Sequence, residues 1–194
     1  MHSGKGVVAL PWNQRGPSGT AAIAVAVGSS EWLGVTVEIE RKFLVRCCPQ
    51  DLCRYPSAFL LQGYLASGPG GEVRIRSADG HCTLTAKSGA GMTRQEHEVA
   101  INREQFDAMW PGTDGRRLEK RRYTIPAGTH TYELDLYLGS LAGLMTVEVE
   151  FDSVDDAMAF ERPAWFGPEV TKDDSYKNAA LAHRGRPKDA GSAP

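Results

Sequence analysis

The sequence predicts a protein of the α+β class that is mainly β, built on an antiparallel sheet or barrel of about eight strands. Two observations lead to this prediction. Charged and apolar residues alternate over short segments along most of the chain, as they do on strands whose two faces meet different surroundings. Clusters of Gly, Pro, Ser and Asp separate these segments at the short intervals that turns between antiparallel strands require.

The first predicted strand begins at Val37, where the chain reads VEIERKFLV. Alternate side chains of a strand point to opposite faces, so Glu38, Glu40 and Lys42 share one face and apolar residues share the other. The same pattern, together with the segment FLLQGYL, predicts strands near residues 59–65, 73–76, 83–87, 96–101, 120–123, 132–136 and 147–151. Turn residues separate these strands at 68–71, 79–80, 88–91, 126–128 and 139–143.

Helices are predicted only as short pieces. Asn102 is a suitable N-cap for a helix over Arg103–Trp110, and a second helix is expected over Asp155–Arg162. Two aspartates, at 173 and 174, are suitable caps for a last helix over Ser175–His183. The strands are therefore expected to be the main elements of the fold.

The composition excludes several classes of protein. The 194 residues carry 22 Lys+Arg and 24 Asp+Glu, a formal charge of −2, which argues against a nucleic-acid partner held by bulk positive charge. No apolar run approaches the ~20 residues needed to span a bilayer, so no membrane partner is expected. The 4 cysteines contain no CxxC pair and are expected to be reduced thiols, which makes the cytoplasm the default compartment.

One domain is expected, over residues 35–183, because the chain is too short to bury two large cores. Residues 1–34 are rich in Gly, Pro, Ser and Ala and carry few charges, so they are expected to form a disordered N-terminal extension. Residues 184–194 are expected to form a flexible tail.

Like charges repeat at alternate positions of the predicted strands. Same-face neighbours on a strand lie ~7 Å apart, so each like-charged pair costs about 2 kcal/mol at an effective dielectric constant of about 20. The acidic pairs are Glu38/Glu40, Glu96/Glu98, Glu133/Asp135 and Glu148/Glu150, and the basic pairs are Arg74/Arg76 and Lys120/Arg122. One alternating strand is most simply a solvated face over a packed one. Repetition of this cost indicates instead a site that gathers cations and polyanions.

The two signs of charge suggest a chemistry. Six cations suit phosphate oxygens, the arginines as planar forks and the lysines as point charges: Lys42, Arg74, Arg76, Lys87, Lys120 and Arg122. The paired carboxylates outnumber them, so this face alone would repel a polyphosphate. Divalent cations held by several carboxylates would resolve the conflict, and oxygen ligands without His or Cys favour Mg²⁺ or Mn²⁺. The residues thus point to metal-assisted chemistry on a phosphate chain.

The ordered series of motifs resembles the CYTH domain, or triphosphate tunnel metalloenzyme, superfamily. VEIERK at 37–42 matches the ExExK motif of that superfamily. The match continues through QGYL (62–65), VRIR (73–76), LTAK (84–87), EHEV (96–99), EKRRY (119–123), YELDLYLG (132–139), VEVEF (147–151) and EVTKDDSYKNAALA (169–182). It covers residues 36–182 in order, and it is most similar to the bacterial branch that has a short tunnel, a C-terminal plug helix and inorganic triphosphatases among its members.

The resemblance implies an eight-stranded antiparallel β-barrel, the triphosphate tunnel, with a few short helices and a C-terminal plug helix. It implies a metal set of Glu38, Glu40, Asp135, Glu148 and Glu150. It also implies a triphosphate clamp of Lys42, Arg74, Arg76, Lys87, Lys120 and Arg122. Of these residues, we expect Glu38, Glu40, Lys42 and Lys87 to take part in catalysis.

The resemblance leaves other positions open. Glu96, Glu98 and Glu133 share the charged face and would orient basic residues or a second metal ion. Tyr176 matches the plug helix and would either help to close the tunnel or pack as an ordinary tyrosine. The first strand of the family usually starts near the initiating Met, so Val35 is hypothesised to mark an alternative start, which N-terminal sequencing of the native protein would test.

The expected reaction is attack of water on a terminal phosphorus of inorganic tripolyphosphate, which gives pyrophosphate and phosphate with the help of Mg²⁺ or Mn²⁺. The proton acceptor is open between metal-activated water and a tunnel glutamate. One alternative is an adenylate cyclase or thiamine triphosphatase of the same superfamily, which would need a pocket for the organic group. Another is a non-catalytic polyphosphate- or nucleotide-binding module. The expected partner is a small-molecule triphosphate, and the protein is expected to be a monomer or homodimer.

Overall fold

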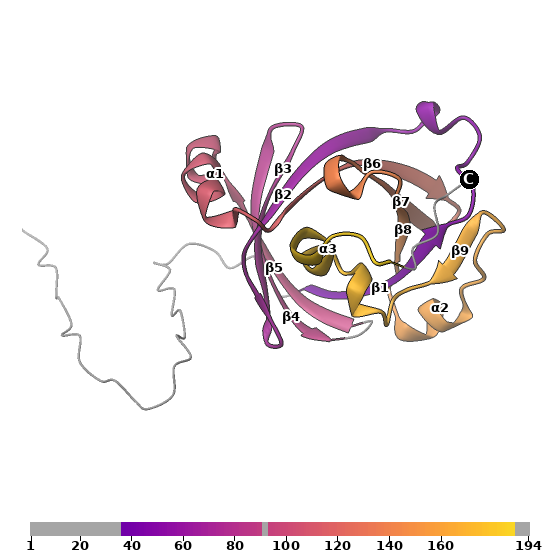
Figure 1. Cartoon of the computed structure of the whole chain (residues 1–194). Helices are drawn as coiled ribbons and strands as arrows, with labels where there is room; N and C mark the ends of the chain where they lie inside the picture. Colours follow the sequence, from indigo (N-terminus) through magenta and orange to yellow (C-terminus); the bar gives the residue numbers. More distant parts are fainter. Residues whose placement is uncertain (1–35, 91–92, 189–194) are drawn as a thin grey trace, which may run out of the picture. The chain divides into compact units, whose positions relative to one another are not determined.

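Eight antiparallel strands close into a barrel in the computed structural model, which describes residues 36–90 and 93–188 (Figure 1). The strands are β1 (Thr36–Val45), β2 (Ser57–Gly68), β3 (Gly71–Ala78), β4 (His81–Ala90), β5 (Thr93–Ile101), β6 (Arg117–Ala127), β7 (His130–Tyr137) and β8 (Met145–Glu150). Their order is β5-β4-β3-β2-β6-β7-β8-β1, and pairing of β1 with β5 closes the sheet. The predicted mainly β, eight-stranded antiparallel barrel is therefore confirmed.

The predictions for the ends of the chain fall largely beyond this part of it. The disordered extension predicted over residues 1–34 lies outside the described residues, and so do residues 189–194 of the predicted tail. Within the described residues, no helix is long and apolar enough to cross a membrane.

The alternation of the sequence divides each strand between the inside and the outside of the barrel. The side chains that point inward are polar, and Thr85, Lys120 and Asp135 are almost completely buried among them. The apolar residues of the same strands point outward and pack under other elements. Phe43 and Val147, for example, belong to one buried cluster with Phe166 and Ala157. The hydrophobic core thus lies around the barrel wall, which leaves the interior for charge.

Short helices cover parts of the wall. Helix α1 (Arg103–Met109) starts at Asn102, whose side chain accepts a hydrogen bond from the backbone N–H of Gln105 in a capping box. Helix α2 spans Val154–Ala159 and is capped by Ser153. It ends three residues before the predicted end at Arg162, because Phe160 turns to an extended conformation and joins an aromatic cluster. Pro163 would in any case disfavour a helical Arg162.

The predicted helix over Ser175–His183 was wrong as one piece. The chain forms a 3₁₀ turn over Asp174–Tyr176, then an extended Lys177, and then helix α3 (Asn178–Arg184). The Asp173 carboxylate accepts a hydrogen bond from the backbone N–H of Ser175 and caps the 3₁₀ turn. This break turns α3 so that the segment before it also faces the barrel interior.

One strand was not predicted. β9 (Phe166–Glu169) pairs with β1 outside the closed barrel. It contains Gly167 and Pro168, which read as loop residues, and its pairing with β1 is irregular. Gly167 suits this point because a Cβ there would lie only 3.0 Å from the carbonyl oxygen of Leu44.

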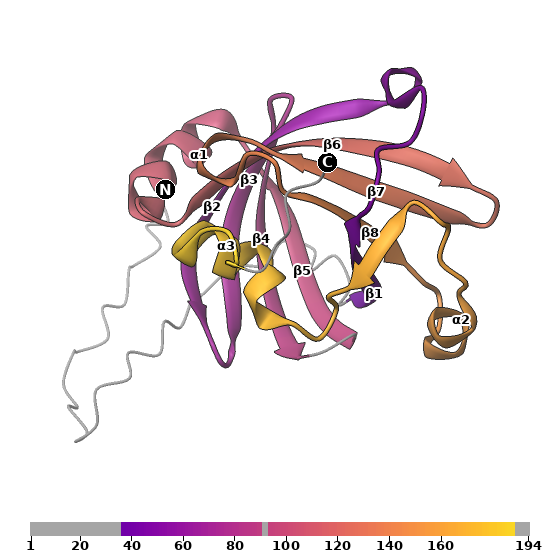
Figure 2. The ribbon, with the colours of Figure 1, turned by 45° about the vertical axis from the view of Figure 1, so that its right-hand side comes forward.

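The register fixes the two ends of the barrel. Ser57 of β2 lies opposite Tyr123 of β6, and Gly63 lies opposite Arg117. The β2–β3 turn and the β6–β7 turn therefore lie at opposite ends (Figure 2). Helix α3 lies at the end of the β2–β3 turn, where Tyr137 of β7 donates a hydrogen bond to Asn178 with an O–O distance of 2.6 Å.

Candidate active site in the barrel interior

The barrel encloses a cavity of about 390 Å³ that is lined mostly by charged side chains. Its carboxylates are Glu38, Glu40, Glu72, Glu96, Glu98, Glu133, Glu148, Glu150 and Asp173, and its cations are Lys42, Arg74, Arg76, Lys87, Arg94, Lys120, Arg122 and Lys177. The structure therefore brings together the predicted site residues from seven of the strands, with the exception of Asp135. That residue is completely buried and does not line the cavity.

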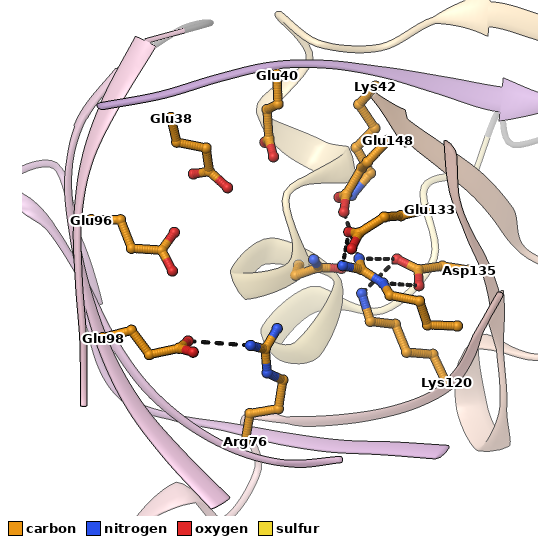
Figure 3. Close-up of polar contacts among 12 residues, drawn as sticks. Glu38, Glu40, Lys42, Arg76, Glu96, Glu98, Lys120, Glu133, Asp135 and Glu148 are labelled. Carbon is orange, nitrogen blue, oxygen red and sulfur yellow. Dashed lines mark hydrogen bonds and ion pairs between the residues drawn. The ribbon is translucent and has the colours of Figure 1, made fainter. Parts of the chain in front are cut away.

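Arg122 organises the part of the site formed by β6, β7 and β8. The labelled side chains of Lys120, Asp135 and Glu148 lie together there (Figure 3). Its guanidinium donates two hydrogen bonds of 2.7 Å to Asp135 and one of 2.6 Å to Glu148, and it also pairs with Glu133. Lys120 donates to Asp135 with an N–O distance of 2.5 Å, and Lys42 lies 3.0 Å from Glu148. Three acids and three cations thus form one network.

This network sets the protonation states of its members. Burial alone would raise the pKa of Asp135, but Arg122 and Lys120 outweigh burial and hold that pKa below its usual value. Lys42 and Arg122 do the same, more strongly, for Glu148. Burial and the nearby positive charge of Arg122 lower the pKa of Lys120 to about 8. The acids are therefore ionised at neutral pH, and the ammonium of Lys120 is close to its titration point.

A second group of ion pairs joins β1, β4 and β5. Lys87 donates to both oxygens of Glu38 at 2.9 and 2.7 Å and lies 2.6 Å from Glu96. Arg94 pairs with Glu40 and lies 3.5 Å from Glu38. Both acids of the ExExK motif are therefore held by cations of this chain.

A third group involves the arginines of β3. Arg76 donates a hydrogen bond of 3.2 Å to Glu98, which also accepts one of 2.7 Å from Thr85. The Arg74 guanidinium lies 3.8 Å from Glu96. The prediction that Glu96 and Glu98 orient basic residues agrees with these contacts, although no contact tests a second metal ion.

Some donors of the site have no acceptor. The Nε atoms of Arg74 and Arg94 are buried and make no hydrogen bond within the described part of the chain. A buried donor without a partner costs about 1–3 kcal/mol, and more when it is charged. An anion that entered the cavity could supply the missing acceptors, so these atoms favour a polyanionic ligand.

Several lining residues were missed by the sequence reasoning. Arg94 was not selected, although it precedes Glu96 and Glu98 by even steps and so shares their face. Gln62 lies in the QGYL motif and donates a hydrogen bond of 2.5 Å to the Tyr64 hydroxyl. Lys177 comes from the segment that was predicted as helix. Arg94, Gln62 and Glu72 carried a usable signal, which is their position in the alternation.

Tyr176 packs as an ordinary tyrosine and also lines the cavity. Its side chain lines the cavity, and it also belongs to a buried apolar cluster with Leu118, Tyr137 and Leu181. The residue thus joins the segment before α3 to the barrel wall at the end where α3 lies.

The carboxylates fit a divalent cation by their chemistry. Among residues 36–90 and 93–188, no three Asp, Glu, His or Cys side chains are placed so that they could hold a metal ion together. However, Glu150 lies directly opposite Glu40 in the strand register, and Glu38 shares the same face. Burial and the neighbouring carboxylate of Glu148 raise the pKa of Glu40 to about 7, and burial and Glu133 raise that of Glu150. A cation among these oxygens would relieve this repulsion.

The raised pKa of Glu40 predicts a pH-dependent stability. The folded protein binds more protons at Glu40 than the unfolded chain between pH 4.5 and about 7. Glu40 therefore adds stability below pH 4.5 that is lost as the pH rises through about 7. In EDTA, the free energy of unfolding of the wild type should fall from pH 5 to 7.5 relative to Glu40→Gln, as measured by urea denaturation. Parallel curves for the two proteins would contradict this assignment.

No protein-family model matches the chain. The chain is 49% identical over 149 residues to an inorganic triphosphatase of Nitrosomonas europaea, and this match covers 75% of the chain and 96% of the relative. The chain belongs to the inorganic triphosphatase family of the CYTH superfamily.

Other members of the inorganic triphosphatase family extend the likeness. The chain is 32% identical over 148 residues to an inorganic triphosphatase of Acetivibrio thermocellus, which covers 74% of the chain and 92% of that relative. A crystal structure of an inorganic triphosphatase matches the chain with a TM-score of 0.58 and 45% identity, and covers 75% of this chain and 94% of that one. The superfamily predicted from the motif series is confirmed.

Proposed function

We propose that this protein hydrolyses inorganic tripolyphosphate to pyrophosphate and phosphate inside the barrel, with Mg²⁺ or Mn²⁺ as cofactor. The observation that carries the proposal is the cavity itself, in which phosphate-binding cations alternate with carboxylates and two buried guanidinium donors lack acceptors. The likeness to inorganic triphosphatases supports the same reaction.

The lining of the cavity supports an inorganic substrate over an organic one. Among the described residues that line it, Tyr176 is the only aromatic residue. An adenine or thiamine ring would gain most of its binding energy from aromatic or apolar surface, which this interior provides only sparsely. We therefore rank an adenylate cyclase or a thiamine triphosphatase below the inorganic triphosphatase.

The residues of the cavity divide the work of the reaction. Glu38, Glu40 and Glu150 would hold the divalent cation, which, when bound, neutralises phosphate charge and activates a water molecule. Arg74 and Arg76 approach from β3 and would bind phosphate oxygens, with Lys42 and Lys87 nearby. Arg122 and Lys120 hold Glu148 and Asp135, so this placement supports Asp135 as a buried counter-ion rather than a metal ligand. Lys120, whose pKa is lowered to about 8, titrates near neutral pH and is the proposed group for proton transfer.

The setting of the reaction is also a proposal. The paired charges that the sequence carries point into the barrel, so they offer no surface for a nucleic acid or a membrane. The four cysteines of the described chain are free, which suits the reducing cytoplasm. We propose a monomer or homodimer that has a small-molecule triphosphate as its partner.

Phosphate release from purified protein tests the function. The substrates are tripolyphosphate, ATP, thiamine triphosphate and pyrophosphate, each with Mg²⁺, with Mn²⁺ and with EDTA. Release is expected from tripolyphosphate with either metal and is expected to stop in EDTA. Preferred turnover of ATP or thiamine triphosphate would favour the organic alternatives. Thermal stabilisation by tripolyphosphate without any release would favour a binding module.

A further inference from the structure

Arg94 occupies the carboxylates that the proposed function gives to the metal ion. In the register of β1 and β5 it lies directly opposite Glu38, so the two side chains are cross-strand neighbours on the inner face. Its Nη2 atom pairs with an oxygen of Glu40 and lies 3.5 Å from one of Glu38. One guanidinium therefore contacts both acids of the ExExK motif.

A second cavity beside Arg94 has room for its guanidinium. Arg94 lines this cavity, of about 470 Å³, which lies between β4, the β2–β3 turn and α3. This cavity shares Glu72, Lys87 and Lys177 with the main one, so the two adjoin beside Arg94. The Nε atom of Arg94 is buried without an acceptor, so its present position leaves one of its donors unsatisfied.

A divalent cation and an arginine compete for the same oxygens. The guanidinium keeps its proton at any ordinary pH, so it cannot leave Glu40 by becoming neutral and can leave only by moving. Arg76, by contrast, pairs with Glu98 and contacts neither acid of the motif. Among the arginines of the cavity whose pairs are described, Arg94 is thus the one placed to exchange with a metal ion.

We propose that Arg94 is a positioning residue that holds Glu38 and Glu40 in the metal-free protein and moves to the triphosphate when a divalent cation binds. This inference rests on the proposed function and deepens it. The exchange frees an anion-binding group only after the metal has bound. Binding of metal and binding of triphosphate therefore strengthen each other, and Arg94 carries part of that coupling.

Binding of Mn²⁺ alone tests the first half of the inference. The full chain without substrate is titrated with Mn²⁺ by calorimetry as wild type, Arg94→Ala and the matched tunnel variant Arg76→Ala. Arg94→Ala should bind Mn²⁺ about tenfold more tightly than wild type. The substitution removes the attraction between the guanidinium and the two carboxylates, and a loss of about 1.4 kcal/mol of this competing attraction corresponds to a factor of ten in affinity. Arg76→Ala removes the same charge from the same cavity and should change the affinity less than about threefold, because its partner Glu98 is not shared.

The outcomes separate the proposals. An equal gain in Mn²⁺ affinity in Arg94→Ala and Arg76→Ala would show a general effect of charge and overturn the proposed exchange of Arg94 with the metal ion. Unchanged or weaker Mn²⁺ binding in Arg94→Ala would also overturn it. Absence of Mn²⁺ binding in all three proteins would instead contradict the metal-dependent function. If Arg94→Ala fails to fold by circular dichroism, Arg94→Lys replaces it and should show a smaller tightening, because an ammonium makes a single-point contact.

Triphosphate affinity with and without metal tests the second half. In EDTA, where Arg94 remains on the carboxylates, Arg94→Ala should bind tripolyphosphate within about twofold of wild type. With Mn²⁺, the KM of Arg94→Ala for tripolyphosphate should rise about tenfold, as loss of one charge-assisted contact gives. An equal loss of affinity in both conditions would identify Arg94 as a permanent clamp residue and overturn the movement.

Discussion

Glu38→Gln should lower metal-dependent hydrolysis of tripolyphosphate by about 100-fold or more while the barrel stays folded. The substitution keeps the shape of the side chain but removes a charge from the proposed metal site, where several kcal/mol of transition-state stabilisation are at stake. Glu38 lines the cavity and accepts both hydrogen bonds from Lys87. The measurement is phosphate release under saturating Mg²⁺ or Mn²⁺, with circular dichroism as the check of the fold.

Glu119→Gln is the matched control for this result. Glu119 lies on the outer, exposed face of β6, so the change alters the net charge equally without touching the cavity. Its activity should remain within about twofold of the wild type, because exposed substitutions away from a site have small effects. Full activity in Glu38→Gln would remove this residue from the site, and equal losses in both variants would show that net charge rather than position matters.

Arg122→Ala should destabilise the protein by about 3–5 kcal/mol, the cost of breaking a buried ion pair by removing one partner. Arg122 holds Asp135, Glu133 and Glu148 together, and Asp135 is completely buried. Without the guanidinium, these acids would repel one another with only lysines left to balance them. Urea denaturation in EDTA measures the loss without a contribution from bound metal.

Arg121→Ala is the neighbouring control. Arg121 is next in the chain but points outward and is exposed, with one hydrogen bond of 3.4 Å to Ser57. It should change the stability by less than about 0.5 kcal/mol. Arg122→Lys keeps the charge and should recover part of the loss, because a lysine cannot make the two parallel bonds to Asp135. Similar losses for Arg121→Ala and Arg122→Ala would contradict the central role of Arg122.

The alternation predicted which side chains face the interior, because a strand has only two faces and the chain repeats that choice strictly. Glu38, Glu40 and Lys42 are an example, and the cavity contains all three. Elements without a period were harder to predict. β9 was missed because its Gly167 and Pro168 read as a loop, and only its pairing with Phe43 and Val45 of β1 makes it a strand.

The pairing of individual charges could not be read from the sequence. Asp135 shares the parity of the proposed metal ligands, yet Lys120 and Arg122 take both of its oxygens and withdraw it from the cavity. Arg94 lies two residues before Glu96 and so shares its face, but it was not selected because it stands next to a predicted turn. Its partners come from β1, far away in the chain. The position of a residue in the alternation gives the face on which it lies, whereas its partner depends on which strand lies beside it.

The sequence by itself determined the class of fold, the inward face of each strand and the family, because these follow from local alternation and from motifs in a fixed order. Only the tertiary structure decided how the charges combine. Closure of the barrel by β1 and β5 places Arg94 on the acids of the ExExK motif. Burial raises the pKa of both Glu148 and Glu40, but Lys42 and Arg122 keep Glu148 ionised, whereas the pKa of Glu40 is raised to about 7. These properties depend on distances across strands and on exclusion of water, and neither is encoded by position along the chain.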